Sequence, residues 1–137
     1  MTPPDRGELG RSAEDLAVAH LEAAGAQILL RNFRRRSGEL DIIALQNNTV
    51  LVVEVRLRSR TDYGGAAASV DAIKQRKIIR TTEQLLQMHR DLARRPVRFD
   101  VVVVMPTPSS LSTPDAPTDS SGAWQVEWIR HAFEARR

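Results

Sequence analysis

Two carboxylates in one strand-turn-strand segment are the side chains best placed to do chemistry. The stretch GELDIIALQNNTVLVVEVRLRSR places Asp41 before the pair Asn47-Asn48 and Glu54 after it. Two asparagines can adopt the positive φ angles of a two-residue hairpin turn, and both flanking runs have the aliphatic composition of strands. With this turn, Asp41 lies directly opposite Glu54. A four-residue loop over 46–49 would keep that pairing, whereas a three- or five-residue loop would break it.

An opposed acidic pair of this kind needs a compensating positive charge. Directly opposed residues have Cβ atoms roughly 4.5–5.5 Å apart, a separation at which like charges are destabilising. Mg²⁺ and Mn²⁺ prefer oxygen ligands, and Mg²⁺ usually combines one or two carboxylates with phosphate oxygens of a substrate. Asp41 and Glu54 are therefore candidate metal ligands. The same pairing places Glu39 opposite Arg56 and predicts a cross-strand salt bridge there.

Basic residues surround the acidic pair. Residues 31–60 carry 7 basic and 3 acidic side chains, although the net charge of the whole chain is only +3. Arginine forks match phosphate groups, and a basic stripe is typical of proteins that bind nucleic acid. A basic cluster alone would indicate a solvated face, but with acids inside it we expect a phosphodiester partner such as DNA. The candidate phosphate-binding residues are Arg34, Arg35, Arg36, Arg58 and Arg60.

Length and composition predict one domain over residues 1–137, with a core at about 10–105. Residues 106–122 are rich in Pro, Ser and Thr and are expected to form a flexible loop, followed by a strand and tail over 123–137. The absence of cysteine excludes disulfides, thiolate metal sites and a cysteine nucleophile. No apolar run approaches the ~18 residues of a membrane span, and the polar start does not resemble a signal peptide. These features predict a soluble cytoplasmic protein.

The first half of the chain alternates one helix with three strands. A capping box at Ser12 and Asp15 predicts the start of a helix that stops at Gly25. The stretch QILLRNFR predicts a first strand, and the hairpin supplies two more, near 39–45 and 49–58. These three strands would form an antiparallel sheet.

The second half predicts a long helix and two further strands. Ser69 can cap the helix, and the stretches VRFDVVVVM and WQVEWI indicate a buried strand and a strand at the sheet edge. The fold class is therefore α/β, with helices packed on a central mixed sheet in the order helix-strand-strand-strand-helix-strand plus a C-terminal edge strand. The stripe of the helix comprises Val70, Lys74, Ile78, Thr81, Leu85, Met88 and Leu92.

The motifs together resemble the uncharacterised bacterial YraN-like family, which is placed in the restriction-endonuclease-like PD-(D/E)XK nuclease superfamily beside Holliday-junction resolvases. The resemblance covers roughly Gly10 to Met105, most of the expected domain. It is carried by GRSAEDLA with Gly10, Glu14 and Ala17, by Asn32, by Gly38-Glu39-Leu40-Asp41, by Glu54-Val55-Arg56, by Lys74, and by Arg98-Phe99-Asp100.

This resemblance implies a restriction-endonuclease-like sandwich and a metal-dependent endonuclease that hydrolyses DNA, by analogy branched DNA or repair intermediates. The acids at Asp41 and Glu54 would hold Mg²⁺ or Mn²⁺, helped by the backbone carbonyl of Val55, and Glu14 on the first helix would complete the site. Such a metal polarises the phosphoryl oxygen and supplies a hydroxide nucleophile.

Residue 56 departs from the superfamily motif, which has lysine where this chain has Arg56. Lysine can position or deprotonate the attacking water, whereas arginine stays charged in proteins and cannot act as a base. Arg56 could instead stabilise charge on the phosphorane, or Lys74 could supply the missing cation from the helix. The alternative function is therefore a noncatalytic nucleic-acid-binding or adaptor protein that retains the nuclease fold.

Simpler interpretations stand beside these assignments. Glu14 in a first helical turn is favoured by the helix dipole alone, and Lys74 could merely extend its ammonium into water. Asp100 at a strand start is more consistent with a structural hydrogen-bond acceptor than with a ligand. Two nearby carboxylates would also suit a retaining glycosidase, but an aromatic content of 4% leaves little to bind sugar. A resolvase-like role would favour a homodimer, with the unpaired edge at Trp124–Ile129 as its interface.

Overall fold

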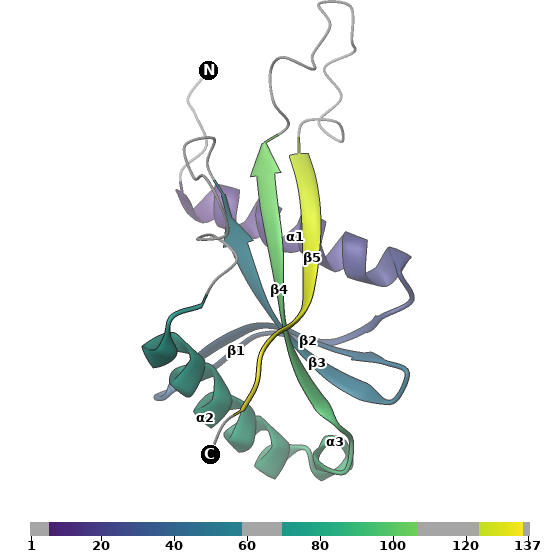
Figure 1. The fold of residues 1–137 in the computed structure, drawn as a ribbon, viewed down its shortest axis with the longest axis vertical. Helices are drawn as coiled ribbons and strands as arrows, with labels where there is room; N and C mark the ends of the chain where they lie inside the picture. The colour runs from purple at the N-terminus through teal and green to yellow at the C-terminus, as the bar shows by residue number, and fades with distance from the viewer. Residues whose placement is uncertain (1–5, 59–69, 107–123, 136–137) are drawn as a thin grey trace, which may run out of the picture.

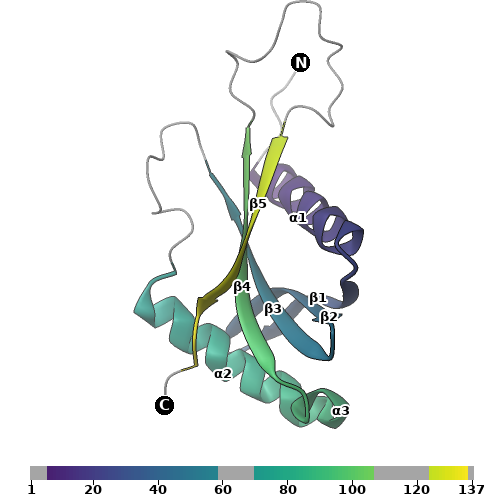
Figure 2. The ribbon, with the colours of Figure 1, turned by 45° about the vertical axis from the view of Figure 1, so that its right-hand side comes forward.

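Helices cover both faces of a five-stranded mixed sheet (Figures 1 and 2). This computed structural model describes residues 6–58, 70–106 and 124–135. The α/β class and the mixed sheet are confirmed. The elements are α1 (Arg6–Ala23), β1 (Gln27–Arg35), β2 (Gly38–Gln46), β3 (Thr49–Leu57), α2 (Ala72–Met88), α3 (Arg90–Ala93), β4 (Val97–Pro106) and β5 (Trp124–Phe133).

The strands lie in the order β1-β2-β3-β4-β5, and only β3 and β4 are parallel. A parallel pair requires a crossover connection, which here contains α2 and α3. Helix α1 packs on one face of the sheet and α2 on the other, as Figure 2 shows. Each face has its own apolar layer, so β3 and β4 are buried on both sides.

The predicted hairpin turn is confirmed. Asn47 and Asn48 have φ angles of 49° and 65°, and β2 pairs with β3 from Gln46 opposite Thr49 to Ile42 opposite Val53. The pairing then stops, because β2 continues beside β1 while β3 continues beside β4. Figure 1 shows the end of β3 rising away from β1 and β2. The two strands thus diverge immediately before Asp41 and Glu54.

Three predictions about the helices were wrong in detail. Helix α1 begins at Arg6, so Ser12 and Asp15 lie inside it rather than at its start. Helix α2 is capped by Asp71, whose carboxylate accepts the Lys74 backbone N–H at 2.8 Å, and not by Ser69, which lies outside the described residues. The expected long helix also ends at Met88, so that Leu92 belongs to the separate α3.

The C-terminal strand occupies the predicted edge position. β5 pairs with β4 alone, and Trp124, Val126 and Trp128 pack against the apolar layer on the α1 side. The predicted flexible loop at 106–122 lies outside the described residues except for Pro106, the last residue of β4. None of the helices in the described residues has the length and apolar character that crossing a membrane requires.

Candidate functional site

Asp41 and Glu54 lie where β2 and β3 diverge. Asp41 Oδ2 accepts the backbone N–H of Val55 at 2.8 Å, so the carboxylate of β2 bonds to the β3 backbone just beyond the last paired residues. The whole Glu54 residue is only 7% exposed. The prediction that the hairpin brings the two acids together is therefore consistent with the observed register, although the ladder itself ends before them.

Burial, together with the neighbouring charge of Glu54, raises the pKa of Asp41 from 3.8 to about 7. The Val55 N–H lowers this pKa, while Glu14 and Glu39 add smaller increases. The common cause is that a carboxylate is costly to ionise in a place with little water and other negative charges nearby. Near neutral pH, Asp41 will therefore bind either a proton or another cation.

Lys74 supplies one positive charge to this site from α2. Its Nζ lies 2.8 Å from Glu54 Oε1, and its side chain is 42% exposed while that of Glu54 is 9% exposed. The ammonium is therefore at the opening of the site and not in the core. Of the two interpretations of Lys74, the structure favours the one in which it reaches the carboxylates.

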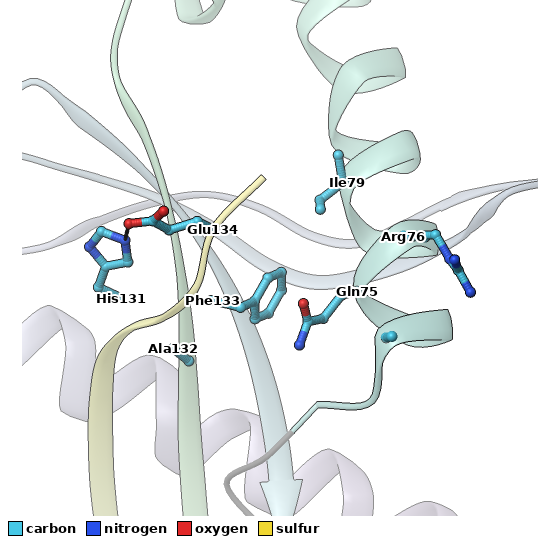
Figure 3. Close-up of a pocket in the computed structure, with 8 residues that line it drawn as sticks. Gln75, Arg76, Ile79, His131, Ala132, Phe133 and Glu134 are labelled. Carbon is cyan, nitrogen blue, oxygen red and sulfur yellow. Dashed lines mark hydrogen bonds and ion pairs between the residues drawn. The ribbon is translucent and has the colours of Figure 1, made fainter. Parts of the chain in front are cut away.

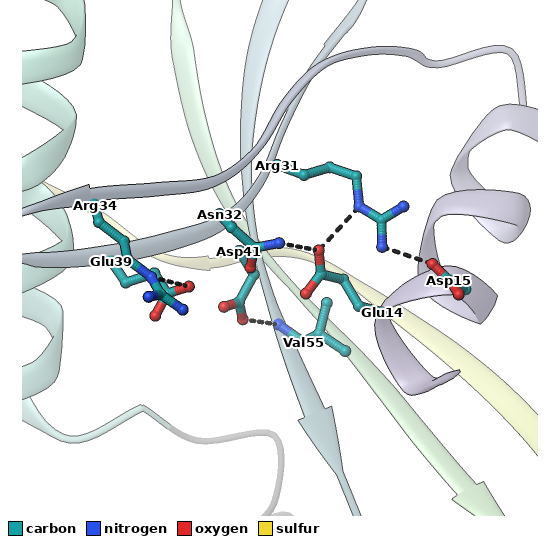
Figure 4. A network of polar contacts seen from close by, with 8 residues as sticks. All are labelled: Glu14, Asp15, Arg31, Asn32, Arg34, Glu39, Asp41 and Val55. Carbon is teal, nitrogen blue, oxygen red and sulfur yellow. Dashed lines mark hydrogen bonds and ion pairs between the residues drawn. The ribbon is translucent and has the colours of Figure 1, made fainter. Parts of the chain in front are cut away.

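Glu14 reaches toward the same region from α1, as Figure 4 shows. Its Oε1 accepts hydrogen bonds from Arg31 Nε at 2.9 Å and from Asn32 Nδ2 at 3.1 Å. Arg31 also donates through Nη2 to Asp15 Oδ1 at 2.7 Å, and these two acids raise the pKa of the Arg31 guanidinium. Glu14 is thus held by two donors of β1 and close enough to influence Asp41.

Asn32 is a site residue whose role could not be found from its sequence position alone. It has a φ of 54° in the middle of β1, a left-handed conformation that asparagine tolerates better than most residues. Its side-chain amide donates to Glu14 from this conformation. The resemblance to the YraN-like family included Asn32 but gave it no role, and its contact with Glu14 is visible only in the structure.

The predicted arginines occupy two different positions. Arg34, Arg35 and Arg36 are exposed at the end of β1, and Arg34 Nε forms an ion pair with Glu39 Oε1 at 3.2 Å. The predicted pair between Glu39 and Arg56 was wrong, because Glu39 faces Arg34 across β1 and β2 while β3 has turned away.

On β3, Arg56 lies two residues after Glu54, opposite Val103, and Arg58 follows the strand. Arg60 lies outside the described residues. We call the point where β2 and β3 diverge the fork. The basic residues before and after the hairpin therefore lie on strands that run in different directions from the fork.

The fork presents carboxylate oxygens, the type of donor that hard divalent cations prefer. Asp41 Oδ1 and Glu54 Oε2 form no hydrogen bond with any described residue, so each carboxylate keeps one oxygen available. No three His, Cys, Asp or Glu side chains gather closely enough to hold a metal in the described part of the chain. The two acids thus offer a partial ligand set, which backbone, water or substrate oxygens would have to complete.

Asp100 is a structural residue, as its position predicted. It is 1% exposed and accepts hydrogen bonds from Arg98 Nε and Nη2, Trp128 Nε1 and the His131 backbone N–H, all between 2.8 and 2.9 Å. The bonds from Trp128 and His131 join β4 to β5. The acid is therefore fully used by the fold.

A hollow of about 530 Å³ lies between the first half of α2 and the end of β5, separate from the acidic pair (Figure 3). Phe133 forms part of its wall and stacks on Phe99, with ring centroids 4.9 Å apart. Its polar groups are of both charges, including Arg76 and Glu134. No prediction from the sequence concerned this hollow.

Fold and site together define an α/β protein with two neighbouring acids, Asp41 and the buried Glu54, at the fork of a mixed sheet. Residues 13–104 match the model of the uncharacterised protein family UPF0102, and the chain belongs to this family. The YraN-like resemblance is thereby confirmed. Similar relatives are UPF0102 proteins of Stutzerimonas stutzeri (44% identical, over 92% of this chain and 94% of the relative) and Methylobacillus flagellatus (39%, over 93% and 98%). A third, from Pseudomonas aeruginosa strain LESB58, is 42% identical over 92% of each chain.

Proposed function

We propose that this protein is a metal-dependent endonuclease that hydrolyses phosphodiester bonds of DNA on a restriction-endonuclease-like fold. The observation that carries the proposal is the pair of a half-buried Asp41 and a buried Glu54, each with one available oxygen. Such a pair is unstable unless a positive charge offsets it, and the raised pKa of Asp41 reflects that cost. A divalent cation with a bound phosphate is the partner that this donor set fits best.

Each nearby residue has a distinct role under this proposal. Asp41 and Glu54 would bind Mg²⁺ or Mn²⁺, with the Val55 carbonyl as a third ligand and Glu14 as a further acid. The metal would polarise the phosphoryl oxygen and lower the pKa of a water molecule. Lys74, already 2.8 Å from Glu54, would hold the scissile phosphate or the attacking water through its ammonium.

The DNA partner is supported by the charge around the site. Arg34, Arg35 and Arg36 are exposed at the end of β1, on the strand that also donates to Glu14. Arginine binds phosphate through paired hydrogen bonds, and arginines beside an acidic metal site can hold a polyanion against acids that would otherwise repel it. Branched or repair-intermediate DNA is the substrate that the superfamily resemblance suggests.

The proposal is tested by titrating Mn²⁺ into the parent protein and into Asp41→Ala by calorimetry, alongside cleavage assays on duplex, single-stranded and four-way-junction DNA. We expect the parent to bind Mn²⁺ and cleave, and the variant to lose both. Asp91→Ala on α3 removes an exposed acid far from the fork in sequence and is the matched control. Metal-dependent cleavage that survives Asp41→Ala would refute the assignment.

A noncatalytic DNA-binding or adaptor role is the second candidate, and Arg56 is the observation that favours it. Arginine in place of the motif lysine removes the residue best suited to activate water. Lys74 also already neutralises Glu54 without any metal. Arg56→Lys separates the two candidates. A variant that cleaves where the parent only binds DNA would favour the adaptor role.

A further inference from the structure

Helix α2 carries positive charge at the end where a helix least tolerates it. Lys74, Arg76, Lys77 and Arg80 lie in its first half, and its first turn contains no acidic residue. The first turn of a helix bears a partial positive charge, so a cation there, in α2 Lys74, is unfavourable. Cations three or four residues apart on a helix, such as Arg76 and Arg80, also repel one another.

Only one of these four charges is offset within the described residues. Lys74 pairs with Glu54, whereas the other three form no ion pair with any residue that the structure describes. All three are exposed, and we call them the α2 ridge: Arg76, Lys77 and Arg80. Of the three, Arg76 also borders the hollow between α2 and the end of β5 (Figure 3). Among the described residues, no ion pair therefore offsets the charges of the α2 ridge.

The α2 ridge lies beside the arginines of β1. The turn between β1 and β2 packs on α2, because Ser37 Oγ lies 2.7 Å from Thr81 Oγ1 and 3.1 Å from Gln84 Oε1. A Cβ placed on Gly38 would lie 3.6 Å from Lys77 Cβ. The exposed Arg36 is part of this turn, next to Ser37. Positive charge is thus continuous from the end of β1 to the first half of α2, on the helix that also carries Lys74.

We propose that the α2 ridge binds the phosphate backbone of DNA and leads the strand toward Lys74 and Glu54. Proteins keep locally unfavourable residues chiefly at functional sites, and unpaired exposed cations complement a polyanion. This inference rests on the proposed DNA partner and adds a second binding surface to it. It does not require hydrolysis, because the ridge would hold phosphates whether or not they are cleaved.

The test compares two double variants that remove the same charge. Arg76→Gln with Arg80→Gln changes the ridge, and Arg90→Gln with Arg94→Gln changes two exposed arginines of the same spacing at the far end of the helical segment. Affinity for a short duplex is measured by fluorescence anisotropy in EDTA at several salt concentrations. Each lost phosphate contact should lower the slope of log K against log salt by about 0.9, so the ridge variant should lose about 1.8 relative to the control.

A stability measurement separates a binding role from a structural one. The ridge variant should unfold at a higher temperature than the parent, because two unfavourable charges are gone, while its DNA affinity falls. Equal salt slopes in the two double variants, or a ridge variant that is less stable, would overturn the inference. A parent that binds DNA through the ridge but never cleaves would refute hydrolysis alone, and a parent that binds no DNA would refute the ridge as well.

Discussion

Lys74 Nζ lies 2.8 Å from Glu54 Oε1, so a cation from α2 is already in contact with a buried acid of β3. The two residues are twenty positions apart and belong to different layers of the fold. The packing of α2 on the sheet therefore depends in part on the charge of the carboxylates at the fork. Because the charge of Glu54 contributes to the raised pKa of Asp41, a ligand that binds either carboxylate should also affect the other two side chains.

Removal of the Lys74 ammonium should have opposite effects on metal binding and on stability. Lys74→Met keeps an apolar stem but leaves Glu54 buried without its partner, which should cost roughly 1–2 kcal/mol given that the lysine is partly exposed. The same change removes a competing positive charge, so Mn²⁺ should bind more tightly while any cleavage falls. Urea denaturation and calorimetry measure the two effects.

Lys77→Met is the matched control for that experiment, since Lys77 is exposed and has no ion pair with a described residue. It should leave Mn²⁺ affinity close to the parent value and should not lower stability. Weaker Mn²⁺ binding in Lys74→Met than in Lys77→Met would show that Lys74 does not compete with the metal.

The raised pKa of Asp41 predicts how stability depends on pH. Between the ordinary value of 3.8 and about 7, the folded state holds a proton on Asp41 that the unfolded state has released. Stability from this group is therefore present at low pH and is lost as pH rises toward 7. Asp41→Asn removes the titration while its amide oxygen can still accept the Val55 N–H.

Without divalent metal, Asp41→Asn should be about as stable as the parent near pH 4 and more stable, by a few kcal/mol at roughly 1.4 kcal/mol per pKa unit, near pH 8. Urea denaturation at several pH values provides the measurement. Parallel stability profiles for the two proteins would mean that Asp41 is ionised without cost in the folded state.

Asn32 allows its backbone role to be separated from its role toward Glu14. Its φ of 54° is strained for alanine but not for glycine, so Asn32→Ala should lose about 1–2 kcal/mol more stability than Asn32→Gly. Both variants lose the hydrogen bond to Glu14 Oε1. If Glu14 contributes to the metal site, both should therefore weaken Mn²⁺ binding to a similar extent.

Thermal denaturation and calorimetry on the two Asn32 variants give the comparison, with Asn48→Gly as a control for a left-handed asparagine outside the site. If Mn²⁺ affinity falls in Asn32→Ala, the less stable variant, but not in Asn32→Gly, then Asn32 acts only through its backbone conformation.

The parts of the fold that follow from local sequence were predictable. Asn47-Asn48 determines the hairpin turn and hence its register, and the valine run of β4 indicates a strand buried on both faces. The point where β2 and β3 diverge was not predictable, because it depends on β4 pairing with β3 beyond the hairpin. That divergence is also why Glu39 pairs with Arg34 on β1 rather than with Arg56.

The candidate site shows the same division. Asp41 and Glu54 were predicted from the register of the hairpin and Lys74 from the helical stripe, and both patterns depend on residues close together in sequence. The contacts of Glu14 with Arg31 and Asn32 join α1 to β1 across seventeen or more positions, so no local pattern reports them. The same is true of the bond between Asp100 and Trp128.

Asp100 should control the attachment of β5 to the sheet. Its carboxylate accepts four hydrogen bonds, from Arg98, Trp128 and the His131 backbone, and Arg98 has a raised pKa because of it. Asp100→Asn supplies one acceptor oxygen and leaves the Arg98 charge without its buried partner. We expect a loss of about 2–4 kcal/mol, reduced from the cost of a fully buried pair because the Arg98 side chain is 26% exposed.

Both tryptophans of the chain lie in β5, so tryptophan fluorescence reports on this strand directly. Asp100→Asn should shift the emission to longer wavelength and increase quenching by acrylamide at denaturant concentrations where the helical circular dichroism is still that of the folded protein. Asp91→Asn on α3 should change neither signal, since Asp91 is exposed. Coincident loss of fluorescence and helical signals in Asp100→Asn would mean that β5 unfolds with the whole domain and that Asp100 stabilises the domain as one unit.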